Sequence, residues 1–176
     1  MLVEVMTKGS FMFKVLTTGD GGVGKTTLLY RYVNGIFLED TKITIGVEFF
    51  LKRVILNETN IILQLWDFGG QDRFQFMHNH YTEGAKGAIL MYDLTRPITL
   101  DNLDYWVNLC RKDNPNIPII FIGGKSDVVN TVIIKENTIE NLIKKYSFCD
   151  YLEISSKTGE NVEKVFEILA ENILSI

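Results

Sequence analysis

Short apolar runs alternate with longer amphipathic segments along most of this chain. Apolar runs of this length are typical of buried strands, and apolar residues that recur every three or four positions are typical of helices packed on a core. Strands that alternate with helices indicate βαβ units, and therefore a mostly parallel sheet covered on both faces. The predicted strands of this kind span residues 11–18, 87–92, 117–122 and 151–154, and the predicted helices span 25–34, 100–111, 135–145 and 161–174.

One pair of predicted strands has a different connection. Residues 48–56 and 61–66 flank the polar turn at 57–60, and this pattern predicts an antiparallel hairpin. The hairpin adds one antiparallel edge strand to the sheet. In sheets of this kind ligands bind at the carboxyl ends of the strands, so we expect the chemistry to lie in the segments that follow each strand.

The composition narrows the class of protein. The chain has 176 residues, of which 46% are hydrophobic and 23% charged, as expected for about one folded domain. Its formal net charge of -4 argues against nucleic-acid binding and against a polybasic membrane-surface protein. The chain shows no membrane-spanning apolar run and no secretion signal, and its two cysteines cannot form a disulfide framework or a zinc site. We therefore expect a cytoplasmic monomer with an N-terminal extension at 1–10 and one domain at 11–176.

The strongest local motif follows the first predicted strand. Residues 19–26 read Gly-Asp-Gly-Gly-Val-Gly-Lys-Thr and fit the pattern G-x-x-x-x-G-K-[ST]. Glycines let backbone N–H groups turn toward phosphate oxygens, the next helix adds its positive N-terminal end, and the lysine adds a charge. A glycine-rich turn without a ligand is the alternative, but the position between a strand and a helix favours a nucleotide. The predicted nucleotide-binding residues here are Gly21, Gly22, Val23, Gly24, Lys25, Thr26 and Thr27.

Three oxygen-bearing side chains predict a Mg²⁺ site beside this loop. Thr26 and Asp67, which ends a predicted strand, are the expected metal ligands, Asp67 through a water molecule. Thr44 lies in the loop after the first helix, where a hydroxyl that ligates the metal only with a γ-phosphate present would make the loop a sensor. Alone, Thr44 would be a solvated loop residue and Asp67 a cap. After Asp67, Gly70 is placed to offer a backbone N–H to the γ-phosphate, and Gln71 to orient an attacking water.

Two further strand ends carry residues suited to a base. One carboxylate can accept both adjacent donors of guanine, N1–H and N2–H₂, and adenine has no such pair, so Asp127 is the predicted guanine-binding residue. The aliphatic stem of Lys125 can cover one face of the base, and a backbone N–H near Ser156 can donate to O6. The predicted base-site residues are Lys125, Asp127, Ser155, Ser156 and Lys157.

Together these segments resemble the Ras superfamily of small GTPases, and specifically its Rab-type branch. Residues 44–49, 63–67 and 87–95 carry the resemblance, which extends from about residue 13 to residue 174. It implies an α/β fold of the P-loop NTPase type, a G domain with a six-stranded, mostly parallel sheet, one antiparallel edge strand and about five helices. It also implies a GTP/GDP cycle with Mg²⁺, in which an exchange factor, a GTPase-activating protein and effectors bind the switch regions.

The resemblance also assigns roles to residues that no local motif marks. Phe37 resembles the aromatic residue that packs edge-on against guanine, and Gly21 resembles the glycine whose missing Cβ leaves room for the catalytic geometry. Phe49, Trp66 and Tyr81 resemble the aromatic triad that Rab-type proteins present to effectors. Ordinary core packing explains these three aromatic residues equally well, so both interpretations stay open.

Three positions depart from the family pattern. Gly124 stands where the base motif has asparagine, so we expect weaker nucleotide affinity and faster exchange, with the guanine preference kept by Asp127. Phe68-Gly69 replaces the usual Thr-Ala, although Gly-Gly-Gln also occurs in Arf-type relatives. The sequence ends in Ser175-Ile176 without a cysteine to prenylate, so we expect no direct lipid anchor, and membrane association only through a missing tail or a partner.

These observations predict a switch that hydrolyses GTP slowly, with Lys25 and Gln71 as catalytic residues and no arginine finger in the chain. A nucleotide-locked binding module with little hydrolysis is the alternative that Gly124 keeps open. A P-loop ATPase or small-molecule kinase is a third hypothesis, and Asp127 argues against it because its carboxylate selects guanine.

Three other residues invite a chemical interpretation. His78 and His80 form a His-x-His pair, but no cysteine or carboxylate cluster joins them, so we expect exposed histidines rather than a metal site. Cys110 lies in a helical pattern beside Leu109, and we expect a small core residue.

Overall fold

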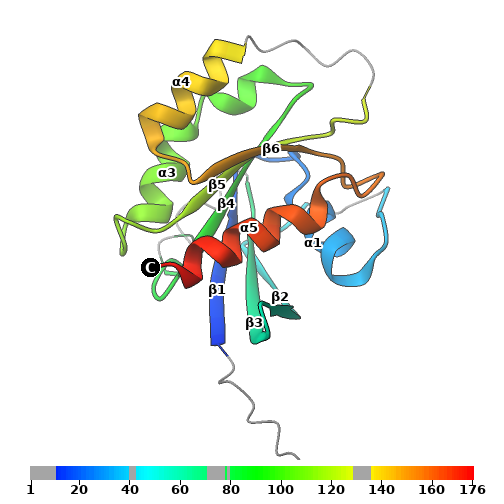
Figure 1. Cartoon of the computed structure of the whole chain (residues 1–176). Coiled ribbons are helices and arrows are strands. Elements are labelled where there is room, and N and C mark those ends of the chain that lie inside the picture. The colour runs from blue at the N-terminus through cyan, green and yellow to red at the C-terminus, as the bar shows by residue number, and fades with distance from the viewer. Residues whose placement is uncertain (1–10, 40–42, 71–77, 79, 129–135) are drawn as a thin grey trace, which may run out of the picture.

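A six-stranded sheet forms the centre of the protein in its computed structural model, which describes residues 11–39, 43–70, 78, 80–128 and 136–176 (Figure 1). The strands lie in the order β2-β3-β1-β4-β5-β6. β2 and β3 pair antiparallel and all other neighbours pair parallel, which confirms the predicted sheet. The predicted extension at 1–10 lies outside the described residues. The strands are β1 (Phe11–Thr18), β2 (Val47–Leu56), β3 (Thr59–Phe68), β4 (Gly87–Asp93), β5 (Ile119–Gly124) and β6 (Asp150–Ile154).

Helices cover both faces of the sheet, so each face has its own hydrophobic core. α1 (Lys25–Asn34) and α5 (Val162–Leu174) lie on one face, and α3 (Leu103–Arg111) and α4 (Glu136–Tyr146) lie on the other (Figure 1). β4 is buried along its whole length, and its side chains alternate between the cores: Met91 belongs to the first and Tyr92 to the second. The described ranges contain one further helix, the short 3-10 helix η2 (Pro97–Leu100), which lies between β4 and α3. None of the helices in these ranges is long and apolar enough to span a membrane.

Local sequence explains where α1 begins and ends. Leu28, Leu29 and Tyr32 are buried, as expected for one apolar face of a helix. Gly35 ends the helix in the left-handed conformation with φ of 73°, and its N–H donates to the carbonyl of Arg31. A glycine in this position satisfies a free carbonyl of the last turn without the steric penalty of a side chain.

The hairpin turn is shorter than the sequence predicts. The prediction of a turn at 57–60 is wrong, because Thr59 and Asn60 already pair with β2. Asn57 and Glu58 form the turn, with positive φ angles of 47° and 63°. Two residues with positive φ match the right-handed twist of the flanking strands, which is why this short loop is preferred in hairpins.

Several other element boundaries differ from the prediction by one or two residues, and the largest shifts are those of β5 and α3. β5 begins at Ile119, after Pro118, and includes both Gly123 and Gly124, which the prediction placed after the strand. Proline has no N–H to donate to a neighbouring strand, so it precedes the strand rather than lying inside it. The helix predicted at 100–111 begins three residues later than expected, at Leu103 in α3, and η2, which has Pro97 in its first turn, precedes it.

The parallel strands bring several predicted segments to one edge of the sheet. β1, β3, β4, β5 and β6 all run in the same direction, so their carboxyl ends lie together. The residues that follow these ends are Gly19, Gly69, Leu94, Lys125 and Ser155. This edge is where ligands bind in sheets of this kind, and the candidate site is built there.

Candidate functional site

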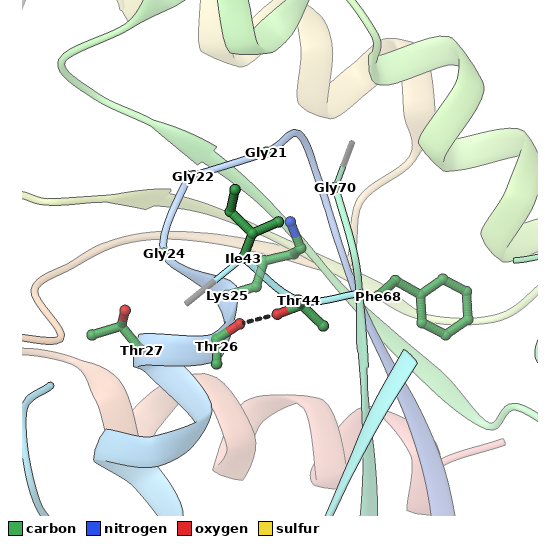
Figure 2. Close-up of a pocket in the computed structure, with 10 residues that line it drawn as sticks. All are labelled: Gly21, Gly22, Gly24, Lys25, Thr26, Thr27, Ile43, Thr44, Phe68 and Gly70. Atoms are coloured by element: carbon green, nitrogen blue, oxygen red, sulfur yellow. Dashed lines mark hydrogen bonds between the residues drawn. The ribbon is translucent and has the colours of Figure 1, made fainter. Parts of the chain in front are cut away.

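The loop between β1 and α1 surrounds the ammonium group of Lys25. Its Nζ donates hydrogen bonds to the backbone carbonyls of Gly19 and Asp20, at 2.7 and 2.8 Å. Lys25 is only 4% exposed, and this burial lowers its pKa to about 8, although the nearby Asp67 and Asp20 oppose the shift. A cavity of about 110 Å³ opens beside the loop, and Figure 2 shows the residues that line it.

Glycine is required at one end of this loop and at one position packed against it, for different reasons. Gly24 adopts φ of 109°, a conformation that side chains rarely allow, immediately before the first turn of α1. Gly70 is the second residue after β3, and a Cβ there would overlap the backbone of Gly19 and Asp20. By the family resemblance, the loop around Thr44 is the first switch and the segment from Gly69 onward is the second switch, so the start of the second switch lies against the phosphate loop. Gln71 itself lies outside the described residues.

Three side-chain oxygens from separate segments meet beside the cavity, which Thr26 and Thr44 line. The hydroxyls of Thr26 and Thr44 lie 2.7 Å apart and point toward each other in Figure 2. Both donate to Oδ2 of Asp67, Thr44 at 3.2 Å. Asp67 is fully buried, and its Oδ1 has no hydrogen-bond partner among the described residues.

These oxygens fit a magnesium ion. Mg²⁺ prefers oxygen ligands and usually combines one or two carboxylates with water and substrate phosphates. No group of three or more His, Cys, Asp or Glu residues suited to a metal occurs in the described part of the chain, so a site made of one carboxylate and two hydroxyls depends on phosphate for further ligands. Burial raises the pKa of Asp67 to about 6, although Lys25 and the two threonine hydroxyls oppose the shift.

A second cavity, of about 350 Å³, adjoins the phosphate loop and contains the residues predicted to bind the base. Asp127, Phe37, Ser156 and Lys157 line it together with Gly22, Gly24 and Thr27. The side chain of Ser155 is buried, and its hydroxyl donates a hydrogen bond to Oδ1 of Asp127 at 2.6 Å. The prediction placed Ser155 with the nucleotide-binding residues, and in the structure it orients the carboxylate.

Lys125 joins the base cavity to the phosphate loop. Its Nζ donates to the carbonyl of Gly22 at 3.2 Å and to Oδ2 of Asp93 at 2.7 Å. The Asp93 carboxylate, at the end of β4, is buried and also accepts hydrogen bonds from Thr95 and Arg96. Burial raises the pKa of Asp93, but the three side-chain donors outweigh this effect and hold its pKa below the ordinary value.

Asp93 and Arg96 are site residues that sequence reasoning missed. Arg96 donates through Nε to Asp93 at 2.8 Å and through Nη2 to the carbonyl of Gly21 at 3.2 Å. Two cations, Lys125 and Arg96, therefore connect one buried carboxylate to consecutive carbonyls of the phosphate loop. The available signal was the position of Asp93 at the end of a buried strand, the same feature that marked Asp67.

Three aromatic residues form a connected group across the β2–β3 hairpin and the segment that precedes β4. The ring centroids of Phe49 and Trp66 lie 5.3 Å apart, and those of Trp66 and Tyr81 lie 5.7 Å apart. Phe49 is 45% exposed, and the ammonium of Lys14 lies over the Trp66 ring at 4.3 Å. Trp66 and Tyr81 are half-buried and pack against the second core, so Phe49 is the exposed member of the group, and its role as an effector surface stays a prediction.

The expectation for the two histidines was half wrong. His80 is exposed, but His78 is fully buried against the rings of Phe68 and Trp106. Its Nδ1 lies 3.2 Å from the hydroxyl of Tyr105. The sequence did not reveal this because the ring fills space between β3 and α3, which are distant along the chain. Cys110 is buried, as expected.

Comparisons with known proteins agree with this arrangement. A family model described as "Ras family" matches residues 14–175. The chain is 33% identical over 165 residues to Ras-related protein Rab-7a of Paramecium octaurelia, covering 91% of this chain and 80% of that protein. It is 34% identical over 170 residues to Ras-related protein Rab7 of Drosophila melanogaster, covering 94% and 82%. With Ras-related protein Rab-7a of Dictyostelium discoideum it shares 33% identity over 175 residues, covering 97% and 86%. With this extent of similarity, the chain belongs to the Ras family of small GTPases and is Rab-like.

Proposed function

We propose that this protein is a GTP/GDP-binding switch that hydrolyses GTP slowly and regulates trafficking or signalling through effectors that bind its GTP form. Residues 11–176 are the proposed G domain. One observation carries the proposal: oxygens of Thr26, Thr44 and Asp67, from three separate segments, converge beside the buried ammonium of Lys25. A loop without a ligand would not need this convergence of hydroxyls on a buried carboxylate.

The phosphate loop binds the β- and γ-phosphates in this proposal. Lys25 exchanges carbonyl partners for phosphate oxygens, and backbone N–H groups of residues 21–27 donate to the same anion at the start of α1. The lowered pKa of Lys25 returns toward its ordinary value beside a phosphate, because a nearby negative charge favours the protonated amine.

Thr44 acts as the sensor of the γ-phosphate. Thr26 and Thr44 hold Mg²⁺ through their hydroxyls and Asp67 holds it through water, and the ion, when bound, neutralises charge on the phosphates. The contact between Thr26 and Thr44 already brings the first switch to the site. Loss of the γ-phosphate removes a shared partner of this group, which releases the switch and with it the effectors.

Hydrolysis requires a positioned water, and Gln71 is the residue proposed to orient it. We assign the N–H of Gly70 as a donor to the γ-phosphate, and the close approach of Gly70 to Gly19 and Asp20 supports this assignment. An arginine from an activating protein accelerates Ras about 10⁵-fold, and we assign no such arginine in this chain, so the intrinsic rate is expected to be slow. An exchange factor completes the cycle by releasing GDP.

Asp127 supplies the preference for guanine. Its carboxylate is held by Ser155 and lines the base cavity beside Phe37 and Lys125. The nucleotide that copurifies, identified by chromatography, tests this assignment, and GDP or GTP is the expected result. Excess unlabelled ATP should fail to displace labelled GTP, and displacement by ATP would instead support an ATPase or a kinase.

The catalytic assignment is tested by Gln71→Leu in single-turnover phosphate release. We expect hydrolysis to fall by about 10-fold or more while GTP affinity stays unchanged, because the residue acts on water rather than on the nucleotide. Gln64→Leu is the matched control: Gln64 is partly buried in β3 and its amide contacts Met12. Unchanged hydrolysis in Gln71→Leu would refute the role of Gln71.

Gly124 favours a second candidate function, a nucleotide-locked binding module with little hydrolysis. The missing side chain removes one connection to the base, and a protein of this kind would recruit partners in one nucleotide state. The same single-turnover assay separates the two functions. No phosphate release from wild type over hours would support the module and contradict the slow switch.

A further inference from the structure

We propose that Met91 takes the place of the side chain that position 124 lacks, and that it is a positioning residue for the base-binding loop. Gly124 is the last residue of β5 and is buried, beside the end of β4. The inference rests on the proposed nucleotide binding. The asparagine that the family usually has at this position would contact the base and would also join the base-binding loop, which follows β5, to the phosphate loop.

The terminal methyl of Met91 fills the space beside Gly124. A Cβ built on Gly124 would overlap Met91 Cε, and it would also lie 3.3 Å from the carbonyl oxygen of Val23. Met91 is 2% exposed, so most of its side chain is packed against its neighbours. A side chain at position 124 therefore competes with Met91 for one volume.

The same methyl also contacts the phosphate loop. A Cβ on Gly24 would lie 3.2 Å from Met91 Cε, and the backbone carbonyl of Met91 lies against Gly19 at the start of the loop. Met91 thus lies between Gly24 of the phosphate loop and Gly124 at the start of the base-binding loop, and it lines the base cavity. An unbranched thioether suits this role because it can fill an irregular gap.

This contact supports the residues that carry the base chemistry. Lys125 follows Gly124 directly, has a positive φ of 68° and donates to Gly22, so its position depends on where β5 ends. Asp127 lies two residues further on. Packing of Met91 against both glycines holds the start of this loop at a fixed distance from the phosphate loop, where a hydrogen-bonding side chain would otherwise do so.

A cycle of four proteins tests the proposal: wild type, Gly124→Asn, Met91→Val and the double variant. The release of fluorescent GDP is followed after addition of excess unlabelled GDP in the presence of Mg²⁺. We expect each single variant to release GDP faster, the first because the introduced amide side chain would displace the methyl and the second because it leaves a gap. The double variant should release GDP more slowly than either, with a coupling of about fivefold or more.

Leu90→Val combined with Gly124→Asn is the matched control, since Leu90 is the neighbour on β4 that belongs to the opposite core. It should show no coupling. Rates that simply multiply, or Gly124→Asn alone slowing release as much as the double variant does, would overturn the proposal. If Gly124→Asn does not fold, Gly124→Ala replaces it in the cycle.

Thermal unfolding of the same proteins without nucleotide, in EDTA, distinguishes shared packing of the two side chains from positioning of the nucleotide. Coupled unfolding temperatures together with coupled release rates support the positioning role. Coupled unfolding temperatures without coupled release would show that the two side chains share space but that Met91 positions nothing for the nucleotide. A wild-type protein that binds no guanine nucleotide would overturn the proposed function and the positioning role together.

Discussion

At the scale of single residues, burial and nearby partners set the pKa values of the charged groups at the site. Lys25 and Asp67 are both buried, and burial lowers the pKa of the amine and raises the pKa of the carboxyl because it disfavours the charged form of each. Asp93 is equally buried, but its lysine, arginine and threonine donors keep it ionised. The first pair is thus suited to gain charged partners, and the Asp93 cluster is already complete.

Arg96 offers a test of that cluster. Arg96→Gln removes the hydrogen bond to the carbonyl of Gly21 and the ion pair with Asp93. We expect GDP release to accelerate by about two- to tenfold and stability to fall by about 1 kcal/mol, because the guanidinium is partly exposed and Lys125 remains on Asp93. Release kinetics and chemical denaturation measure the two effects. Arg53→Gln, on the exposed side of β2, should change neither.

His78 makes stability depend on pH. Burial lowers its pKa, and Lys25 lowers it further, although the backbone of Gly69 opposes the shift. In the unfolded chain His78 becomes protonated near pH 6.5, whereas in the folded protein it stays neutral to a lower pH. His78 therefore makes the unfolding free energy fall as the pH drops below about 6.5. Asp67, with a pKa raised to about 6, contributes the opposite slope, so the difference between proteins is the quantity to compare.

His78→Phe keeps a ring between Phe68 and Trp106 and removes the titration. The loss of stability between pH 7 and pH 5, measured by denaturation, should be smaller in this variant than in wild type. The control is His80→Phe, at an exposed position, which should follow wild type. Equal slopes in all three proteins would show that the proton on His78 does not matter.

The β2–β3 hairpin is the element that connects the two switch regions. Thr44 precedes β2 and Asp67 lies near the end of β3, and the register pairs Glu48 with Asp67 and Phe49 with Trp66. A shift of one residue in this pairing would turn Phe49 away from Trp66 and change the aromatic surface. The two-residue turn at Asn57 and Glu58 therefore helps to set the geometry of the site from the far end of the sheet.

Glu58→Gly tests the contribution of the turn. Glu58 adopts φ of 63°, which glycine tolerates much better than a residue with a Cβ. We expect the unfolding free energy to rise by about 0.5–1 kcal/mol, with unchanged GDP release, because the turn is far from the nucleotide. Asn60→Gly, inside β3, should instead destabilise the hairpin. No gain from Glu58→Gly would contradict the strain assigned to the turn.

The whole molecule places two cores on the faces of one sheet and leaves the chemistry at its edge. Met91 and Leu90 are neighbours on β4 but belong to different cores, so β4 packs against a hydrophobic core on each side. Met91 also contacts the phosphate loop. The loops of the site follow five strand ends, so segments that are distant along the chain form the site together. A bound nucleotide therefore contacts the fold at many points and should stabilise it as a unit.

Nucleotide and magnesium should raise the unfolding temperature in separable steps. At about 100 times its dissociation constant, GDP should add about 2.7 kcal/mol, and Mg²⁺ should add a further increment that EDTA removes. Asp67→Asn should keep much of the first increment and lose most of the second, because the amide holds the metal poorly. Asp101→Asn, at an exposed position, should behave as wild type in scanning fluorimetry. A full magnesium increment in Asp67→Asn would exclude this carboxylate from the metal site.

The sequence by itself determined the alternation of strands and helices, the phosphate loop at 19–26, and the positions of Asp67 near the end of one strand and of Asp127 after another. These features depend on hydrophobic periodicity and on backbone conformations, which neighbouring residues specify locally. The tertiary structure alone decided the two-residue turn at Asn57, the burial of His78, the cluster around Asp93 and the placing of Met91 against Gly124. Those features depend on which side chains the sheet order brings together, and contacts between distant segments leave no local pattern in the chain.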